Sequence, residues 1–362
     1  MDYPIVFIPG LFGSLGDDVI KGTGEFSFGF AEKVYKPFIK ILNSMGYIEG
    51  EDLFISYYDW KKSVLESVDK YLAQDIKKIK KDTGHKKVII IGHSLGGLLG
   101  RAYMTYFNPS NVEKLIMIGT PNFGAINAYC FWSGGKIPYS KVEDNILYNG
   151  IKQGFKLYYD LYHREDYIRG LRNLFPVAKD LLPSYEYGDY LCIEDKDDKQ
   201  IPIQEMSIKN DFLNEINKSV DEDNIYIISG KDFYTNKDFI IKETDKEKTK
   251  WFDGKPVNSY QTTYGDGTVT TFSTLGNFGK NSIILEGNHT DILYKSKNYI
   301  SKILGKAIIE DVEIEKIEKV EVVLSRKSPE IETIISDKGS QTIDLGNDNL
   351  WIMTTKGKKF NI

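Results

Sequence analysis

The stretch from Val88 to Gly97 constrains the fold more than any other part of the chain. Four β-branched residues, Val88 to Ile91, run directly into the sequence Gly-His-Ser-Leu-Gly-Gly. After Ser94, apolar residues recur at spacings of three and four, which is typical of a helix. The pattern therefore predicts a buried strand, a sharp turn that carries Ser94 and a helix, which is the layout of a nucleophile elbow. The glycines fit because a strained turn leaves no room for bulky neighbours.

The elements around this stretch alternate between strand and helix. Strands are predicted at residues 5–8, 53–58, 88–93 and 112–118, with helices between them at about 30–45, 61–81 and 95–107. This alternation is typical of an α/β fold with a mostly parallel, doubly wound sheet covered by helices on both faces. Ligands of such sheets bind at the carboxyl ends of the strands, where the sequence places Leu11, Trp60, Ser94 and Thr120.

The alternation stops after residue 121, and three regions are expected. The first is an α/β-hydrolase core formed by residues 1–121 and 222–310. The second is a helical cap or lid, residues 122–221, inserted into this core. The third is a small β-rich extension at residues 311–362. The later core is predicted to hold strands at 224–228 and 282–285 and a hairpin around 253–254. The insertion shows no clear strand and is rich in aromatic residues. We expect most of these to form the core of the cap and a minority to face substrate.

Composition limits the kinds of binding partner and the cellular location that we expect for this protein. The 362 residues carry a formal net charge of −5, so no basic patch points to nucleic acid. No signal peptide follows Met1, and no apolar run approaches the ~20 residues of a membrane span. We therefore expect a cytoplasmic protein, or a secreted one if a leader was removed. Cys130 and Cys192 can pair or stay free, and the sequence decides neither.

Of the four histidines, only His289 fits the chain order of an α/β-hydrolase triad, in which the acid follows serine and histidine follows the acid. His289 directly follows the last predicted core strand. His85 precedes its strand, on the far side of the sheet, and His163 lies in the insertion. His93 is the variable residue of the elbow and points off the axis of the nucleophile.

The acid is predicted to be Asp266, in the sequence Gly-Asp-Gly between the last two core strands. Its flanking glycines allow a carboxylate to sit in a cramped turn beside another backbone. Weaker candidates are Asp232 and Asp253, while Asp291 comes after the base. Ser94, Asp266 and His289 therefore form the candidate triad.

The anion that develops during ester cleavage needs backbone N–H donors. Leu95 follows the nucleophile at the start of a helix, and Leu11 lies in the Gly-bounded loop after the first strand, so both N–H groups are expected to form the oxyanion hole. Phe12, Trp60 and Phe123 follow the ends of predicted strands and are the candidate substrate-binding residues. No cysteine or histidine spacing indicates a metal site, and no cofactor is expected.

With these pieces identified, the chain resembles the lecithin:cholesterol acyltransferase-like lipases. The matching stretches, in the order of the family, are Ile8–Ser14, Tyr58–Trp60, Gly92–Gly97, Gly119–Ala125, Asp180–Pro183, Gly265–Val269 and His289. The Asp-Trp and Gly-Asp-Gly-Thr-Val pieces discriminate this family from other lipases, and the ordered set is more specific than any single motif.

The resemblance implies an α/β-hydrolase core with a cap that acts on acyl esters of lipids, and it supports the same triad and oxyanion residues. The chain also departs from the family. Lys61 stands where an arginine usually follows the Asp-Trp pair, and the paired cysteines and secretory signal of the animal enzymes are missing. Residues 311–362 match no family that we can name.

The sequence therefore predicts a serine esterase or lipase, including the phospholipase A type, that cleaves lipid acyl esters through an acyl-enzyme on Ser94. An alternative is an O-acyltransferase that moves the acyl group to an alcohol. A third possibility, from another class, is a non-catalytic protein that binds lipid. The expected partner is an acyl-ester substrate, with transient contact with a lipid surface, no nucleic acid and no transmembrane segment.

Overall fold

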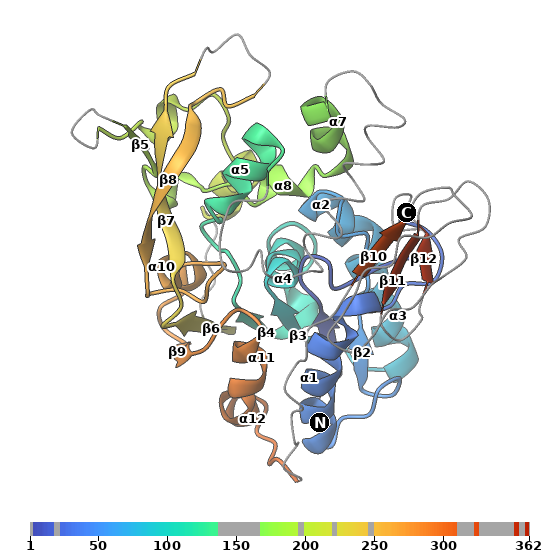
Figure 1. The fold of residues 1–362 in the computed structure, drawn as a ribbon. Helices are drawn as coiled ribbons and strands as arrows, with labels where there is room; N and C mark the ends of the chain where they lie inside the picture. The colour runs from blue at the N-terminus through green and yellow to red at the C-terminus, as the bar shows by residue number, and fades with distance from the viewer. Residues whose placement is uncertain are drawn as a thin grey trace, which may run out of the picture.

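The computed structural model describes residues 3–17, 22–136, 167–194, 199–218, 223–244 and 250–309, together with three strands between residues 322 and 361. Figure 1 shows the arrangement of the elements.

A six-stranded sheet forms the centre of the molecule. Its strands lie in the order β2-β1-β3-β4-β6-β9, and every neighbouring pair is parallel. The strands are β1 (Ile5–Ile8), β2 (Leu53–Ile55), β3 (Val88–His93), β4 (Val112–Ile118), β6 (Ile225–Lys231) and β9 (Ser282–Glu286). The predicted parallel sheet is confirmed, and its strands other than the edge strand β9 are covered by apolar side chains on both faces.

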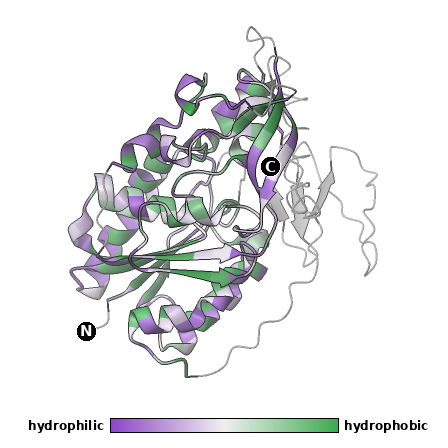
Figure 2. Ribbon diagram, turned by 90° about the vertical axis from the view of Figure 1, so that its left-hand side faces the viewer, coloured by the Kyte–Doolittle hydropathy of each residue, from purple (hydrophilic) through white to green (hydrophobic). Residues whose placement is uncertain are grey.

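Alternate side chains of the strands other than β9 enter two separate hydrophobic layers. On β3, Val88 and Ile90 pack on one face, while Ile89 and Ile91 pack on the other. The first layer is covered by α2 (Val64–Ser67), the π-helical turn η2 (Val68–Leu72), α3 (Ala73–Thr83) and α4 (Leu95–Tyr106). The second is covered by α1 (Glu32–Ser44), α11 (Asp291–Lys295) and α12 (Lys297–Leu304). Figure 2 shows the hydrophobic strands between helices of mixed character.

The cap lies above α4 in Figure 1 and is built from helices and a second sheet. Its helices are α5 (Asn127–Gly134), α7 (Tyr167–Leu174), α8 (Val177–Asp180) and α9 (Asp211–Ile216). The sheet joins β5 (Leu191–Ile193), in parallel, to the hairpin of β7 (Thr235–Lys242) and β8 (Lys255–Thr262). The predicted hairpin is present, but it belongs to the sheet of the cap, whereas the sequence placed it in the later core.

The expectation that the insertion lacks a strand is wrong, because β5 pairs with β7. Leu191 of β5 packs in one buried cluster with Phe239 and Ile241 of β7 and with Trp251. The strand has only three residues, and its partner lies more than forty residues later, so no local periodicity announces it. Of the cap aromatics, Tyr129 is buried in the same cluster, while Phe131 and Phe175 pack against the core layer of α4. Residues 148–162 lie outside the described residues.

The remaining elements are short. They are α10 (Thr271–Leu275) and the helical turns η1 (Gly29–Ala31), η3 (Pro109–Asn111), η5 (Tyr185–Tyr187) and η6 (Ile203–Glu205). In the C-terminal region, β10 (Val322–Ser325), β11 (Trp351–Thr354) and β12 (Lys359–Asn361) form an antiparallel sheet, as the strand-like sequence predicted. The rest of the β-rich extension expected at residues 311–362 lies outside the described residues.

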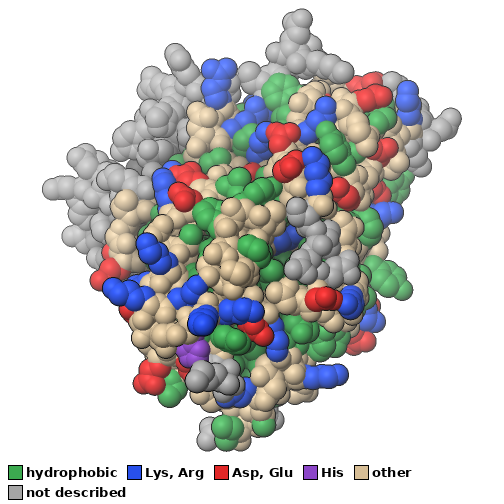
Figure 3. Space-filling view, turned by 180° about the vertical axis from the view of Figure 1, so that it is seen from behind, with side chains coloured by type: hydrophobic (Ala, Val, Ile, Leu, Met, Phe, Trp, Pro, Cys, Tyr) green, Lys and Arg blue, Asp and Glu red, His purple; other side chains and the backbone are tan. Residues whose placement is uncertain are grey.

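Two further observations concern the surface. None of the helices in the described ranges has the length and apolarity that a membrane crossing requires. On the face seen in Figure 3, basic and acidic side chains are interspersed with hydrophobic ones.

Candidate active site

Ser94 sits on a strained turn between β3 and α4. Its backbone has φ 53° and ψ −122°, a conformation that residues other than glycine rarely adopt. The Ser94 N–H donates to the carbonyl of Ile118 on β4, at 2.8 Å. A Cβ at Gly96 would lie 2.2 Å from the carbonyl oxygen of Ile8, so only glycine allows the turn to approach β1 this closely. The predicted strand, turn and helix are therefore present, with the strain typical of functional sites.

His289 and Asp266 lie in direct contact. The imidazole Nδ1 of His289 lies 2.7 Å from Oδ2 of Asp266, whose side chain is fully buried. The other carboxylate oxygen, Oδ1, accepts the N–H groups of Thr268 and Val269 at 2.9 and 2.7 Å. The N–H of His289 donates to the Asp266 carbonyl at 2.9 Å. Both carboxylate oxygens are thus held in place, and Oδ2 points at the imidazole.

The end of β4 brings His289 toward Ser94. Ile118 accepts the N–H of Ser94, and the next residue, Gly119, packs against the imidazole. A Cβ at Gly119 would lie 3.1 Å from Cε1 of His289, and the φ of this residue is +60°. A glycine is required there for both reasons. Ser94 and His289 therefore contact consecutive residues at the carboxyl end of one strand.

Two backbone N–H groups adjoin Ser94. A Cβ at Gly10 would lie 2.9 Å from Cβ of Ser94, so the loop that carries Leu11 rests directly on the serine. Leu95 follows Ser94 as the first residue of α4. Within the described residues, neither the Leu11 N–H nor the Leu95 N–H donates a hydrogen bond. Both groups are available to an incoming anion.

The three candidate substrate-binding residues lie in two places. Phe12 and Trp60 contact each other edge to face, with ring centroids 4.5 Å apart, and Phe175 of the cap stacks on Trp60 at 5.4 Å. Phe123 is buried and packs against Phe272 at 5.3 Å. Trp60 is buried as well, whereas Phe12 is partly exposed. A substrate contact for these three residues stays a prediction.

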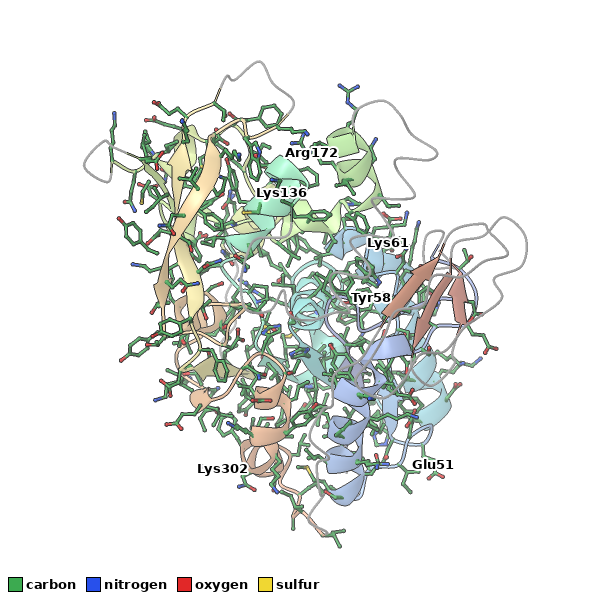
Figure 4. The ribbon with its side chains drawn as sticks, viewed as in Figure 1. Glu51, Tyr58, Lys61, Lys136, Arg172 and Lys302 are labelled. Atoms are coloured by element: carbon green, nitrogen blue, oxygen red, sulfur yellow. The ribbon has the colours of Figure 1, made fainter. Side chains whose placement is uncertain are left out.

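The Tyr58-Asp-Trp-Lys61 segment braces the loop after β1. The Tyr58 hydroxyl donates to the carbonyl of Pro9 at 2.8 Å, and its N–H donates to Oγ of Ser14 at 2.7 Å. Lys61 forms a buried ion pair with Asp59, with Nζ and Oδ1 2.6 Å apart. Tyr58 and Lys61 lie on the side of the core that faces the cap (Figure 4). The sequence alone shows Tyr58 as part of a motif but assigns neither it nor Ser14 a role.

The other candidates take no part in this arrangement. Asp253 accepts the N–H of Ser207 in the cap, and the half-exposed Asp232 lies beside Lys231. His85 makes an edge contact with Tyr3. His163 lies outside the described residues.

The question of the two cysteines is answered by the structure. Cys130 and Cys192 are both buried and are not joined in a disulfide, and burial raises the pKa of the Cys130 thiol to about 12. Over the described ranges, no group of three or more His, Cys, Asp or Glu side chains is placed to hold a metal ion.

Comparison with known proteins identifies the family. The family model for lecithin:cholesterol acyltransferase matches residues 22–264, about two thirds of the chain. The chain belongs to the lecithin:cholesterol acyltransferase family. The matched range contains Trp60 and Ser94 but neither Leu11, Asp266 nor His289. Within this family member, the positions of those three residues rest on the geometry described above.

A relative and two solved structures give the extent of the similarity. Lecithin-cholesterol acyltransferase-like 4 of Arabidopsis thaliana is 34% identical over 85 residues, which cover 22% of this chain and 16% of the relative. A chain of the Tle4–Tli4 complex aligns with a TM-score of 0.52 and 14% identity, over 84% of this chain and 97% of its own. The mature lipase BlEst2 of Bacillus licheniformis aligns with a TM-score of 0.42 and 16% identity, over 84% and 92%. The fold is that of the α/β-hydrolases.

Proposed function

We propose that the protein is a serine hydrolase that cleaves carboxylic esters of lipids, as a lipase, esterase or phospholipase of the A type. The observation that carries this proposal is the contact between Asp266 and His289 beside the strained turn of Ser94. Membership of the lecithin:cholesterol acyltransferase family supports the lipid acyl ester as substrate.

The hydrogen bonds assign a role to each group. Nδ1 of His289 is held by Asp266, so Nε2 is the nitrogen that can take the proton of Ser94. Ser94 Oγ then attacks the ester carbonyl, and His289 returns the proton to the leaving alcohol. Asp266 keeps the imidazole in this tautomer and stabilises its charged form. Water then releases the acyl group: His289 takes the proton of water as it attacks the acyl-enzyme, and returns the proton to Oγ of Ser94.

The negative oxygen of the tetrahedral intermediate is held by the N–H groups of Leu11 and Leu95. Each such donor contributes roughly 3 kcal/mol to lowering the barrier. Both N–H groups are unused within the described residues, and both adjoin Ser94, which supports this role.

Four aromatic side chains near the acid loop support contact with a lipid surface. Phe233 pairs through its backbone with Asp266, and Tyr264 and Phe272 lie on either side of the acid in sequence. These three and Tyr234 are 39–68% exposed. Exposed aromatic rings favour the boundary between water and lipid, where their apolar and polar parts are both satisfied.

An acyltransferase is the second candidate, and the family name favours it. The two activities share the acyl-enzyme and differ in whether water or an alcohol accepts the acyl group. Adding a long-chain alcohol to the assay and separating free fatty acid from ester product distinguishes them. A non-catalytic lipid-binding protein is disfavoured, because binding alone does not require the Asp266–His289 contact.

A series of p-nitrophenyl esters of increasing chain length tests the proposal. We expect hydrolysis by the wild type and loss of at least about 10⁴-fold in kcat for Ser94→Ala. A fluorophosphonate should label the wild type and not the variant. A wild type that is inactive on every chain length and unlabelled would contradict the proposal.

A further inference from the structure

Behind Ser94, two buried side chains connect the loop after β1 to the loop of His289. The residue before the nucleophile, His93, is buried at the end of β3. Its Nε2 lies 2.9 Å from the carbonyl oxygen of His289, and its Nδ1 lies 3.0 Å from the hydroxyl of Tyr35 on α1. The same hydroxyl accepts the N–H of Gly10 at 2.8 Å.

The chemistry of the acceptors determines where the protons lie in this chain. A carbonyl oxygen can only accept a hydrogen bond, so Nε2 of His93 carries a proton and donates a hydrogen bond to the backbone carbonyl of His289. Nδ1 of a neutral imidazole is then an acceptor, so the Tyr35 hydroxyl donates to it. That hydroxyl keeps a lone pair for the N–H of Gly10. Every donor therefore has an acceptor, in the order Gly10, Tyr35, His93 and His289.

The chain needs a neutral His93, and its surroundings favour one. Burial and, to a smaller extent, the neighbouring imidazole of His289 together lower the pKa of His93 to about 3, although its hydrogen bond to the His289 carbonyl acts in the opposite direction. The two imidazole centroids are 4.8 Å apart, so a charge on His93 would oppose the charge that His289 acquires during catalysis.

The two ends of this series of hydrogen bonds lie at the two parts of the site that must be held in place relative to Ser94. Gly10 is adjacent to Leu11, and the loop wraps around Tyr35, since a Cβ at Gly13 would lie 2.5 Å from the tyrosine ring. The other end holds the backbone of His289 itself. Tyr35 is fixed in turn, because its ring stacks on Phe28 with centroids 5.1 Å apart.

We propose that Tyr35 and His93 are positioning residues, which hold the oxyanion N–H of Leu11 and the imidazole of His289 at their working positions around Ser94. This inference rests on the proposed function, because it concerns the same reaction. Both side chains are buried behind Ser94, so we expect neither to touch the substrate. A displacement of reacting groups by about 1 Å costs up to about 100-fold in rate, so the pair acts on kcat rather than on substrate binding.

The first experiment compares Tyr35→Phe with a matched control. The variant loses one oxygen, which frees the Gly10 N–H and Nδ1 of His93. We expect kcat for p-nitrophenyl esters to fall about 10- to 100-fold while KM changes less than about twofold. Tyr129→Phe also removes a buried hydroxyl, one that donates to the carbonyl of Gly254 in the cap, and it should keep the wild-type kcat. An unchanged kcat in Tyr35→Phe, or an effect confined to KM, would overturn the proposal.

Substitutions of His93 test its two hydrogen bonds separately. The amide of His93→Asn can replace Nδ1, and the amide of His93→Gln can replace Nε2, whereas His93→Leu replaces neither. We expect Asn and Gln to retain more of the wild-type kcat than Leu does. A His93→Leu variant that folds and keeps the wild-type kcat would contradict the proposal, even if Tyr35→Phe fails to fold.

The second experiment does not depend on activity. The full chain has four histidines, so ¹⁵N-histidine labelling yields a simple imidazole spectrum, in which His93→Gln identifies the signals of His93. At pH 7 we expect Nε2 of His93 to carry the proton and Nδ1 to be unprotonated. A proton on Nδ1 would overturn the proposed chain of hydrogen bonds. An inactive wild type with the expected tautomer would instead contradict the proposed function and leave the chain of hydrogen bonds standing.

Discussion

The central sheet and the sheet of the cap differ in how clearly the local sequence marks their strands. In the core, β3 leads directly into the turn of Ser94, and β4 follows nineteen residues after β3 ends. In the cap, β5 pairs with a strand that begins more than forty residues later. Long-range pairing occurs in both regions, since β4 of the core pairs with β6, which begins more than one hundred residues later. The core strands are nevertheless marked by their own apolar patterns, whereas the three-residue strand β5 is not. From this difference we expect the catalytic chemistry to depend on the regular core. We expect selection among substrates to depend on the cap that packs against it.

Removing the charge of the acid should produce the largest effect, and it tests whether chemistry belongs to the core. In Asp266→Asn the shape is kept, but the amide no longer favours the working tautomer of His289. We expect kcat to fall about 10⁴-fold, equally for short and long esters. Steady-state kinetics on both substrate lengths measures this. A loss that depended on chain length would place Asp266 in substrate selection instead.

A smaller effect is expected from the cap, at the ring that stacks on Trp60. Phe175→Leu removes the stacking at 5.4 Å and should change kcat/KM for long-chain esters about 3- to 10-fold, with little change for acetate. The equally buried Phe38→Leu, on the opposite face of the sheet, is the matched control. Equal effects of both variants on all chain lengths would mean that the cap does not select the acyl chain.

The smallest effect concerns the contact between the two regions. Asp180 of α8 accepts the N–H of Val64 on α2 at 2.7 Å, and burial raises the pKa of its carboxyl to about 6. The Val64 N–H and Lys179 lower this pKa but do not offset burial. The pKa of an unfolded aspartate is about 4. The folded chain therefore binds more protons between about pH 4 and 6, so this residue's contribution to stability falls as pH rises through that range.

In Asp180→Asn, the amide oxygen can still accept the N–H of Val64 without carrying a charge. We expect the free energy of unfolding to rise by about 2 kcal/mol at pH 7.5 and to change little at pH 4.5. Urea denaturation at both pH values measures the difference between variant and wild type. A variant that is less stable than the wild type at pH 7.5 would show that the charge itself strengthens the contact between cap and core.

The sequence by itself determined the features that local patterns encode. The alternation of apolar runs predicted the parallel sheet, and the glycines around Ser94 predicted the strained turn. Chain order selected Asp266 and His289, which the structure places in contact. The sheet and the turn could be predicted because a buried strand and a tight turn leave short, regular signals, while the rule of triad order led to two side chains that lie in contact.

The tertiary structure alone decided which distant groups meet. The pairing of β5 with β7 has no local signal, since a three-residue strand is stabilised by its neighbours rather than by its own pattern. Tyr35 looks like any core residue of an amphipathic helix, and His93 like a variable position of the elbow. Their hydrogen bonds join residues 25, 58 and 196 positions apart. Such contacts exist only once the sheet has brought the ends of its strands together, because directional bonds depend on distances in space that spacing along the chain does not contain.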